Sequence, residues 1–450
     1  MKRILLLMIA ASLALAGCFS SSSSSTTGAL PIAPGEPTAD VRVLHASADA
    51  PNVDIYVEGT LAIPNLAFGE ATGFVQVPAK ALRIDIRAAG SAVDSDPAFS
   101  ATVSPAADAS YTLVAYGLLG GAEDAAFDLL TIADDRTNAA EGFFRLFVLH
   151  AAVQAGTVDV YLDSGTSEEL GQATIEDFTP RADTGSYLEL ATGTYRVRLT
   201  PAGETDVVYD SGLIDFQSGA SYFVAALDRP SGLSPVSLVA LLNDPAFVAL
   251  EDQRVLVRAL HLSPDAPAVD VLVNDTPVGV TLSFRDVSPY LTVLAGDYTL
   301  GVAPANSTTA VADLDATIEA GKAYSIIATG LLSGSGTQAL ELRPLEDERQ
   351  PAAGDDVLVR VIHAAPDAPA VDVLADGAIL GSLNDVPYFT ASGYLTVPAG
   401  SYDLEVRPAG GAEGSAVITA AGTALASGSI YTVIATGLLA DGLQPVLVVD

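Results

Sequence analysis

A motif built around a histidine occurs four times in this chain and accounts for every histidine that the chain contains. Its copies read VRVLHASADAPNVDIYV from Val41, FVLHAAVQAGTVDVYL from Phe147, VRALHLSPDAPAVDVLV from Val257 and VRVIHAAPDAPAVDVLA from Val359. The histidines His45, His150, His261 and His363 recur at intervals of 105, 111 and 102 residues, by subtraction of their numbers. A period of about one hundred residues is too long for a solenoid repeat and suits a whole small domain. The chain is therefore predicted to be a string of four copies of one module.

Each period is predicted to be all-β, because short runs of β-branched and aromatic residues alternate with breaks rich in Pro, Gly and Asp. Two further landmarks repeat: a small-residue turn that enters a strand, such as Ala399-Gly400-Ser401-Tyr402, and a strand that begins with an aromatic residue, such as Tyr431-Thr432-Val433. We expect the first copy to hold strands at Val41–His45, Val53–Val57, Leu82–Arg87 and Tyr111–Ala115. The fold class that follows is four tandem β-sandwich modules of immunoglobulin-like type.

The predicted modules span residues 40–133, 143–243, 254–345 and 356–450. Polar segments without strand periodicity are expected to join them, at Ala133–Gly142, Asn243–Gln253 and Glu346–Asp356. Connections of about ten residues keep neighbouring modules close to one another.

The first residues indicate an export signal. Lys2 and Arg3 precede an apolar run over Ile4–Leu15, which is too short to span a bilayer and is typical of a secretory signal peptide, predicted over residues 1–17. The run ends in Leu15-Ala16-Gly17-Cys18, which resembles the lipobox of bacterial lipoproteins, and Cys18 is the only cysteine. That resemblance implies acylation of Cys18, and two or three acyl chains would anchor the protein to a membrane. Phe19 rather than Asp follows the cysteine, which favours the outer membrane of the cell envelope.

Residues 18–39, rich in Ser, Thr and Pro, are predicted to form a flexible tether, because such a segment cannot bury enough apolar surface to fold. The net charge of the chain is -35. A field of that sign repels nucleic acid, so nucleic acid is excluded as a partner. The expected partners are the membrane, through the lipid anchor, and an envelope or extracellular protein or polysaccharide.

The motif of the third and fourth copies, followed by Val-Pro-Ala-Gly-x-Tyr and Tyr-Thr-Val-Ile-Ala-x-Gly in the fourth, resembles the DUF4397 family of bacterial extracytoplasmic β-domains. The resemblance covers nearly all of residues 40–450 as tandem copies. It implies a secreted or surface-anchored β-rich module and no catalytic residues. The second copy departs from the pattern, because Gln154 and Gly156 stand where the other copies have Asp and Pro.

The recurring polar residues allow two interpretations. In the first, His45 ends a core-facing stripe and, with the aspartates, locks a tight turn. In the second, each histidine and its aspartates bind a metal ion or a small ligand. The residues concerned are His45, Asp49 and Asp54; His150 and Asp159; His261, Asp265 and Asp270; and His363, Asp367 and Asp372. One histidine in each module and the lack of paired-ligand motifs favour the structural lock, so no metal or cofactor is predicted.

The sequence holds no Gly-x-Ser-x-Gly elbow and no phosphate-binding Gly-rich loop, and repetition suits avidity better than turnover. The chain is therefore predicted not to be an enzyme. The favoured function is a lipid-anchored structural or adhesive protein that binds an envelope or extracellular partner. The alternative is an ion- or small-ligand-binding envelope protein with a His/Asp site in each module.

Overall fold

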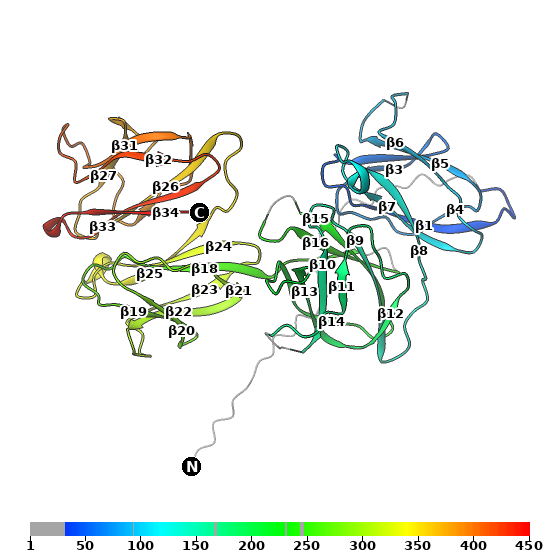
Figure 1. Ribbon diagram of the computed structural model, residues 1–450, viewed down its shortest axis with the longest axis horizontal. Coiled ribbons are helices and arrows are strands. Elements are labelled where there is room, and N and C mark those ends of the chain that lie inside the picture. Colours follow the sequence, from blue (N-terminus) through cyan, green and yellow to red (C-terminus); the bar gives the residue numbers. More distant parts are fainter. Residues whose placement is uncertain (1–31, 93, 166–168, 230–231, 244–246) are drawn as a thin grey trace, which may run out of the picture. The chain divides into compact units, whose positions relative to one another are not determined.

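The computed structural model describes residues 32–92, 94–165, 169–229, 232–243 and 247–450. Across these residues the regular elements are β-strands and three short 3-10 turns, at Glu123–Ala125, Gly336–Gln338 and Leu439–Asp441. The strands form eight sheets, two to a module, so the predicted fold of four tandem β-sandwich modules is confirmed (Figure 1). The predicted signal peptide, Cys18 and most of the predicted tether lie outside the described residues. Within the described part, no helix is long and apolar enough to cross a bilayer.

The first sheet of each module contains the strand that carries the histidine, paired in parallel with the strand that begins with an aromatic residue. In strand order, the first sheet of module 1 is β4 (Val75–Pro78), β1 (Thr38–His45), β7 (Ser110–Tyr116) and β8 (Asp128–Ala133), and that of module 2 is β12 (Leu188–Ala191), β9 (Phe143–Ala151), β15 (Ser221–Asp228), β16 (Val236–Leu242) and β17 (Phe247–Leu250). The first sheet of module 3 is β21 (Leu291–Leu294), β18 (Arg254–His261), β24 (Ala323–Thr329) and β25 (Glu341–Asp347). That of module 4 is β29 (Thr390–Ala391), β26 (Asp356–Ala364), β33 (Ile430–Thr436) and β34 (Gln444–Val449), with β30 (Leu395–Pro398) also paired with β26.

The second sheet of each module is antiparallel throughout. In strand order, the second sheet of module 1 is β3 (Thr60–Leu66), β2 (Val53–Val57), β5 (Leu82–Ala88) and β6 (Phe99–Val103), and that of module 2 is β11 (Ile175–Phe178), β10 (Val158–Ser164), β13 (Gly193–Pro201) and β14 (Tyr209–Phe216). The second sheet of module 3 is β20 (Thr276–Leu282), β19 (Val269–Val273), β22 (Gly296–Pro304) and β23 (Ala312–Ile318). That of module 4 is β28 (Ala378–Ile379), β27 (Val371–Ala375), β31 (Gly400–Pro408) and β32 (Ile418–Leu425).

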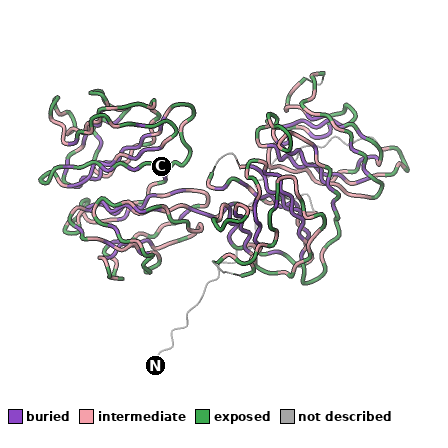
Figure 2. Tube along the Cα trace, in the orientation of Figure 1, coloured by how far each residue is buried: buried purple, intermediate pink, exposed green. Residues whose placement is uncertain are grey.

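Each module holds its own apolar core between its two sheets. In module 4, for example, Val359 and Val361 of β26 pack with Val373 of β27 and Val406 of β31. The buried residues lie along the strands and the connecting loops are largely exposed (Figure 2). Alternation along β26 turns Arg360 to the opposite face of the sheet from these valines. The outer face of the first sheet therefore carries a second set of contacts.

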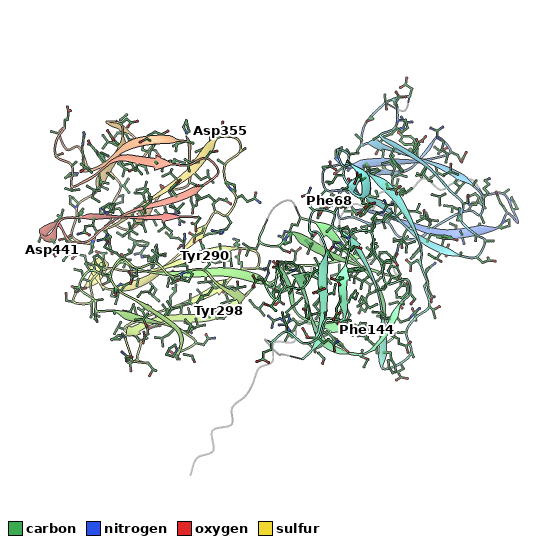
Figure 3. The ribbon with its side chains drawn as sticks, viewed as in Figure 1. Phe68, Phe144, Tyr290, Tyr298, Asp355 and Asp441 are labelled. Atoms are coloured by element: carbon green, nitrogen blue, oxygen red, sulfur yellow. The ribbon has the colours of Figure 1, made fainter. Side chains whose placement is uncertain are left out.

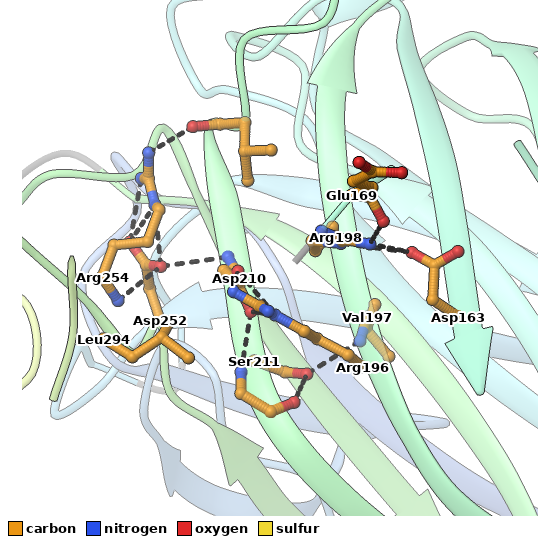
Figure 4. Close-up of polar contacts among 12 residues, drawn as sticks. Asp163, Glu169, Arg196, Val197, Arg198, Asp210, Ser211, Asp252, Arg254 and Leu294 are labelled. Carbon is orange, nitrogen blue, oxygen red and sulfur yellow. Dashed lines mark hydrogen bonds and ion pairs between the residues drawn. The ribbon is translucent and has the colours of Figure 1, made fainter. Parts of the chain in front are cut away.

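The joint expected over Asn243–Gln253 contains a strand, because Phe247–Leu250 forms β17 and pairs with β16 as a fifth strand. Its alternating residues are only partly buried, and so short an edge strand gives a weak sequence signal. Asp252, near the end of this joint, accepts a hydrogen bond from the backbone N–H of Asp210 at 3.1 Å (Figure 4). Its carboxylate also forms an ion pair with Arg254 at 2.9 Å. Arg254 also donates to the carbonyls of Val207 and Val208. These bonds fasten the first strand of module 3 to module 2.

Modules 3 and 4 pack together through the outer faces of their first sheets. The shared core contains Leu260, Leu262 and Ile327 from module 3. Module 4 contributes Ile362 and Ile434, with Ala364, Val446 and Val448 beside them. Because Leu260 and Ile362 both directly precede the motif histidine, the two modules offer equivalent residues to one interface.

Two buried ion pairs cross this interface in reciprocal fashion. Arg258 of β18 binds the side chain of Asp450 through both guanidinium nitrogens, at 2.8 and 2.9 Å. Arg360 of β26 binds Asp347 of β25 at 2.5 Å, and Asp347 also lies 3.4 Å from Arg258. Burial acts to lower the pKa of Arg258, but Asp347 and Asp450 raise it above its ordinary value. Asp347 therefore has an arginine partner in its own module, whereas the bonds of Arg258 to Asp450 and of Arg360 to Asp347 form only when the two modules are packed together.

Replacing Asp347 by Ala is expected to destabilise the pair of modules by about 3 kcal/mol, because it leaves Arg360 buried without its carboxylate. The matched control is Glu341→Ala, which removes the partner of the half-exposed Arg343 in the same strand and should cost about 0–1 kcal/mol. Calorimetric unfolding of both variants measures the difference. Equal losses of stability would show that the buried pair contributes no more than the surface pair.

Candidate functional site

Each motif histidine is fully buried and binds the loop that follows its own strand. The ring Nε2 lies 3.1, 2.8, 3.0 and 3.0 Å from the carbonyl oxygen six residues later, in the pairs His45–Pro51, His150–Gly156, His261–Pro267 and His363–Pro369. In modules 2 to 4 the backbone N–H two residues after the histidine donates to Nδ1. A nitrogen that accepts carries no proton, so Nε2–H is the donor to the carbonyl. The imidazole is therefore neutral and closes the loop.

The backbone of the same histidine holds a second loop, the one that returns to the first sheet from the second. Its carbonyl accepts a hydrogen bond from Gly69, Arg181, Arg285 or Phe389, according to the module. All four donors have a positive φ, between 45° and 77°. An aromatic ring from this loop or the strand before it packs near the imidazole, as Phe68 (labelled in Figure 3) does near His45, with ring centroids 6.2 Å apart. The equivalent rings belong to Phe178, Phe284 and Tyr388.

The loop aspartate binds a third segment. Asp265 accepts hydrogen bonds from the backbone N–H groups of Leu332 and Ser333 at 2.7 and 2.9 Å. Asp367 binds Leu439 in the same way at 3.1 Å, and Asp49 occupies the equivalent loop position in module 1. Burial acts to raise the pKa of Asp265, but the bonds from Ser333 and Leu332 hold it below its ordinary value. The repeated Gly-Leu-Leu sequence thus supplies the donors for this aspartate.

Module 2 makes the same connection in the reverse direction. It has Gln154 in the loop, but Asp228 at the end of β15 accepts from the backbone N–H groups of Val153 and Gln154, at 3.1 and 2.7 Å. In module 3 the residue after the equivalent strand is Gly330, with φ +93°, where a Cβ would lie 2.2 Å from the carbonyl oxygen of Ala339. In module 2 the carboxylate therefore belongs to Asp228 at the end of β15, whereas in module 3 it belongs to Asp265 in the loop after the histidine, and both modules link the same two segments.

The strand aspartate bridges two turns of the second sheet. Asp54 accepts from the backbone N–H groups of Asn65 at 2.8 Å and Gly90 at 3.0 Å. Asp159 binds Asp177 and Gly203, and Asp372 binds Asp385 and Gly410, by the same pair of bonds. Asp270 binds the N–H of Asn306 and the hydroxyl of Thr281. The strand aspartates are therefore turn caps.

The geometry gives the recurring residues separate tasks. The histidine, the loop aspartate and the strand aspartate each bind backbone groups of different segments, and the imidazole lone pair in modules 2 to 4 accepts an N–H. Among the described residues, no three His, Cys, Asp or Glu side chains are gathered in a way that could hold a metal ion. The arrangement fastens loops to one another through their backbone groups.

The sequence does not indicate what the arginine three residues before the histidine binds in modules 1, 3 and 4. Arg42 binds Asp134 at 2.6 Å and Thr112 at 2.8 Å, and it stacks on the ring of Phe74. Module 2 has Phe147 at this position, stacked on Phe223 with ring centroids 4.9 Å apart. Strand parity places Arg42 on the opposite face of the strand from the histidine, but nothing near it in the sequence identifies its carboxylate partner.

A family model described as "Domain of unknown function (DUF4397)" matches residues 39–161, 145–249, 255–374 and 357–450. The chain belongs to the DUF4397 family. The resemblance inferred from the motif is confirmed, and each of the four DUF4397 matches begins shortly before a motif histidine. The histidine lock described above is thus the feature that the DUF4397 copies of this chain share.

No curated protein matches this DUF4397 chain. Among solved structures, the Bacillus anthracis TIE protein is similar at 10% identity, over 89% of this chain and 68% of that chain, with a TM-score of 0.16. A second match is the product complex of a multi-modular glycogen-degrading pneumococcal virulence factor, SpuA, at 10% identity over 62% of this chain and 38% of that chain, with a TM-score of 0.15. No function is carried over from either protein.

Burial lowers the pKa of all four histidines below the ordinary value, against the opposing effect of the loop carbonyl. The folded state therefore disfavours the protonated ring, and stability that is fully present above about pH 6.5 is lost as the pH falls below it. The loss is expected to reach about 1.4 kcal/mol for each histidine for each pH unit. Denaturant unfolding at pH 7.5 and 5.5 measures it.

In the variant with His45, His261 and His363 all changed to Ala, the unfolding free energy at pH 7.5 should fall by about 2 kcal/mol for each altered module, and most of the dependence on pH should disappear. An unchanged pH dependence would rule out the histidines as its cause. Stoichiometric metal in protein purified without chelator, absent from this variant, would instead support the ligand-site alternative.

Proposed function

We propose that this chain is a lipid-anchored envelope protein whose tandem modules act as a structural and adhesive scaffold for an envelope or extracellular partner. The observation that carries the proposal is that the recurring histidine and aspartate side chains of the motif bind backbone groups of their own modules. Four copies of such a motif maintain four copies of a fold. Binding specificity is then left to exposed surfaces, which differ among the modules.

Two further observations support an adhesive scaffold. Modules 3 and 4 pack together through a shared apolar core and so present their surfaces as one body. When linked modules each bind a partner weakly, the whole chain dissociates from that partner slowly. The strongly negative charge keeps an exported protein soluble and favours partners that tolerate or complement it. Catalysis has no part in the proposal.

The anchor rests on Cys18 and the apolar run before it. Changing Cys18 to Ser removes the thiol that would be acylated, so the variant should move from the membrane fraction to the soluble fraction. Cell fractionation followed by immunodetection measures this, and Ser21→Ala is the control for a change within the serine run. Unchanged retention of Cys18→Ser in the membrane would refute the lipid anchor.

The adhesive role predicts saturable binding to the native cell envelope. The Cys18→Ser chain, fluorescently labelled, should bind washed envelope fragments in a manner that the unlabelled chain displaces and an unrelated acidic protein of similar net charge does not. Binding isotherms with both competitors provide the measurement. Binding that does not saturate, or equal displacement by the unrelated protein, would contradict a specific adhesive surface.

A further inference from the structure

Module 1 differs from its three relatives in the space between its sheets. Its core contains a cavity of about 380 Å³, whereas the corresponding spaces in modules 2, 3 and 4 measure about 40, 50 and 40 Å³. Cavities that bind small molecules in proteins usually occupy roughly 300–1,000 Å³ and are mainly apolar. The module 1 cavity falls within that range, and those of the other modules do not.

Module 1 has smaller residues than module 2 at three positions, and two of them, Leu82 and Pro105, line the cavity. The first is Leu82, whose equivalents in modules 2, 3 and 4 are Tyr195, Tyr298 and Tyr402. The hydroxyl of each tyrosine donates a hydrogen bond to the carbonyl four residues earlier in its own module. Figure 3 marks Tyr298 in its strand. Leucine has neither the length to reach that carbonyl nor the hydroxyl to bind it.

The second is Pro105, because the N–H of the next residue, Ala106, donates to the hydroxyl of Tyr111. Phe216 and Leu425 hold the same position in modules 2 and 4, where the N–H of the residue after each donates to Tyr222 and Tyr431, respectively. The third is Ala39, six residues before His45, where module 2 has Phe144 six residues before His150. The equivalent residues in modules 3 and 4 are Val255 and Val357.

These three positions meet in space. In module 2 the rings of Phe144 and Phe216 are stacked with centroids 4.4 Å apart, and Tyr195 lies 5.5 Å from the first and 5.9 Å from the second. Module 1 replaces that whole aromatic cluster with Ala, Pro and Leu. Relative to module 2, the cavity therefore lies where larger side chains are replaced by smaller ones, and modules 3 and 4 keep Tyr298 and Tyr402 in the position of Leu82.

The lining indicates the chemistry of an occupant. Aliphatic residues surround the cavity, among them Val43 of β1, Ile55 of β2 and Ile84 of β5, and none of the described residues that line it is charged. Gln76, an exposed residue of the edge strand β4, also borders the cavity, so the cavity reaches the surface there. An apolar interior with one polar group at its mouth suits a hydrocarbon chain whose polar end stays in water, because apolar cavities take up apolar molecules.

We propose that the core of module 1 is a binding site for a single long hydrocarbon chain, that of a free fatty acid, inserted between the two sheets from the β4 edge. The site lies within one module and does not depend on the lipid anchor or on an adhesive partner. Membrane phospholipid, which offers the same acyl chemistry, is distinguished from free fatty acid in the experiment.

The experiment uses the full chain carrying Cys18→Ser and the fluorescent fatty acid cis-parinaric acid. A saturable rise in fluorescence is expected, and Leu82→Tyr, which restores the side chain of the other modules, should weaken binding at least 10-fold. Leu61→Tyr is the matched control, because Leu61 is an exposed residue of the same sheet, and it should leave binding unchanged. Ala62→Leu, which adds volume at another lining residue, should weaken binding as well and keeps the test decisive if Leu82→Tyr does not fold.

A second arm offers vesicles of phosphatidylcholine that carries a parinaroyl chain. Binding of the free acid alone supports the proposal as stated, whereas transfer from vesicles alone assigns the cavity to a membrane lipid and overturns the choice of free fatty acid. If neither probe binds, or if binding is equal in the wild type, Leu82→Tyr and Ala62→Leu, the cavity is not a lipid site and the proposal fails.

Discussion

The hydrogen bond from the buried imidazole to the carbonyl six residues later is the interaction on which every module of this chain depends. It closes one loop with the side chain, while the backbone of the same residue holds a second loop with positive φ. A neutral imidazole suits this position because it offers one donor and one acceptor in fixed directions. No other side chain combines that pairing with a flat ring able to pack against Phe68 or its equivalents.

Much of the fold could be predicted from the sequence, because the motif strands alternate clearly and occur four times. The predicted strand Val53–Val57 coincides with β2, and Leu82–Arg87 lies within β5. Edge strands such as β17 and the two-residue β29 were not predicted, because so few residues carry no readable period. The parallel pairing of β1 with β7 joins segments about 70 residues apart, and nothing in the local pattern of either strand specifies a parallel neighbour.

The candidate site was predictable in part, and the missing part has a physical cause. The motif identified the residues that matter, but their partners are backbone N–H and carbonyl groups, which every residue possesses. The compensation by Asp228 for Gln154 was hidden for the same reason, since the two lie 74 residues apart and meet through the backbone. The cavity of module 1 was hidden because its lining residues Leu82 and Pro105 are smaller than Tyr195 and Phe216, their equivalents in module 2. Each of those residues is ordinary by itself, and only comparison of the modules with one another reveals them.

The reciprocal ion pairs between modules 3 and 4 have a consequence for the order of events during synthesis. Arg258 and Asp450 are 192 residues apart, so the arginine emerges from the ribosome long before its carboxylate exists. Module 3 ends with β25 at Asp347, and 103 residues remain to Asp450 by subtraction. At about 5–20 residues per second, its apolar sheet face would stay uncovered for roughly 5–20 s. Such a surface is what chaperones recognise, and it would be equally open to the matching face of a second nascent chain. For this pair of modules, the speed at which module 4 is completed therefore bears on whether the correct intramolecular partner arrives first.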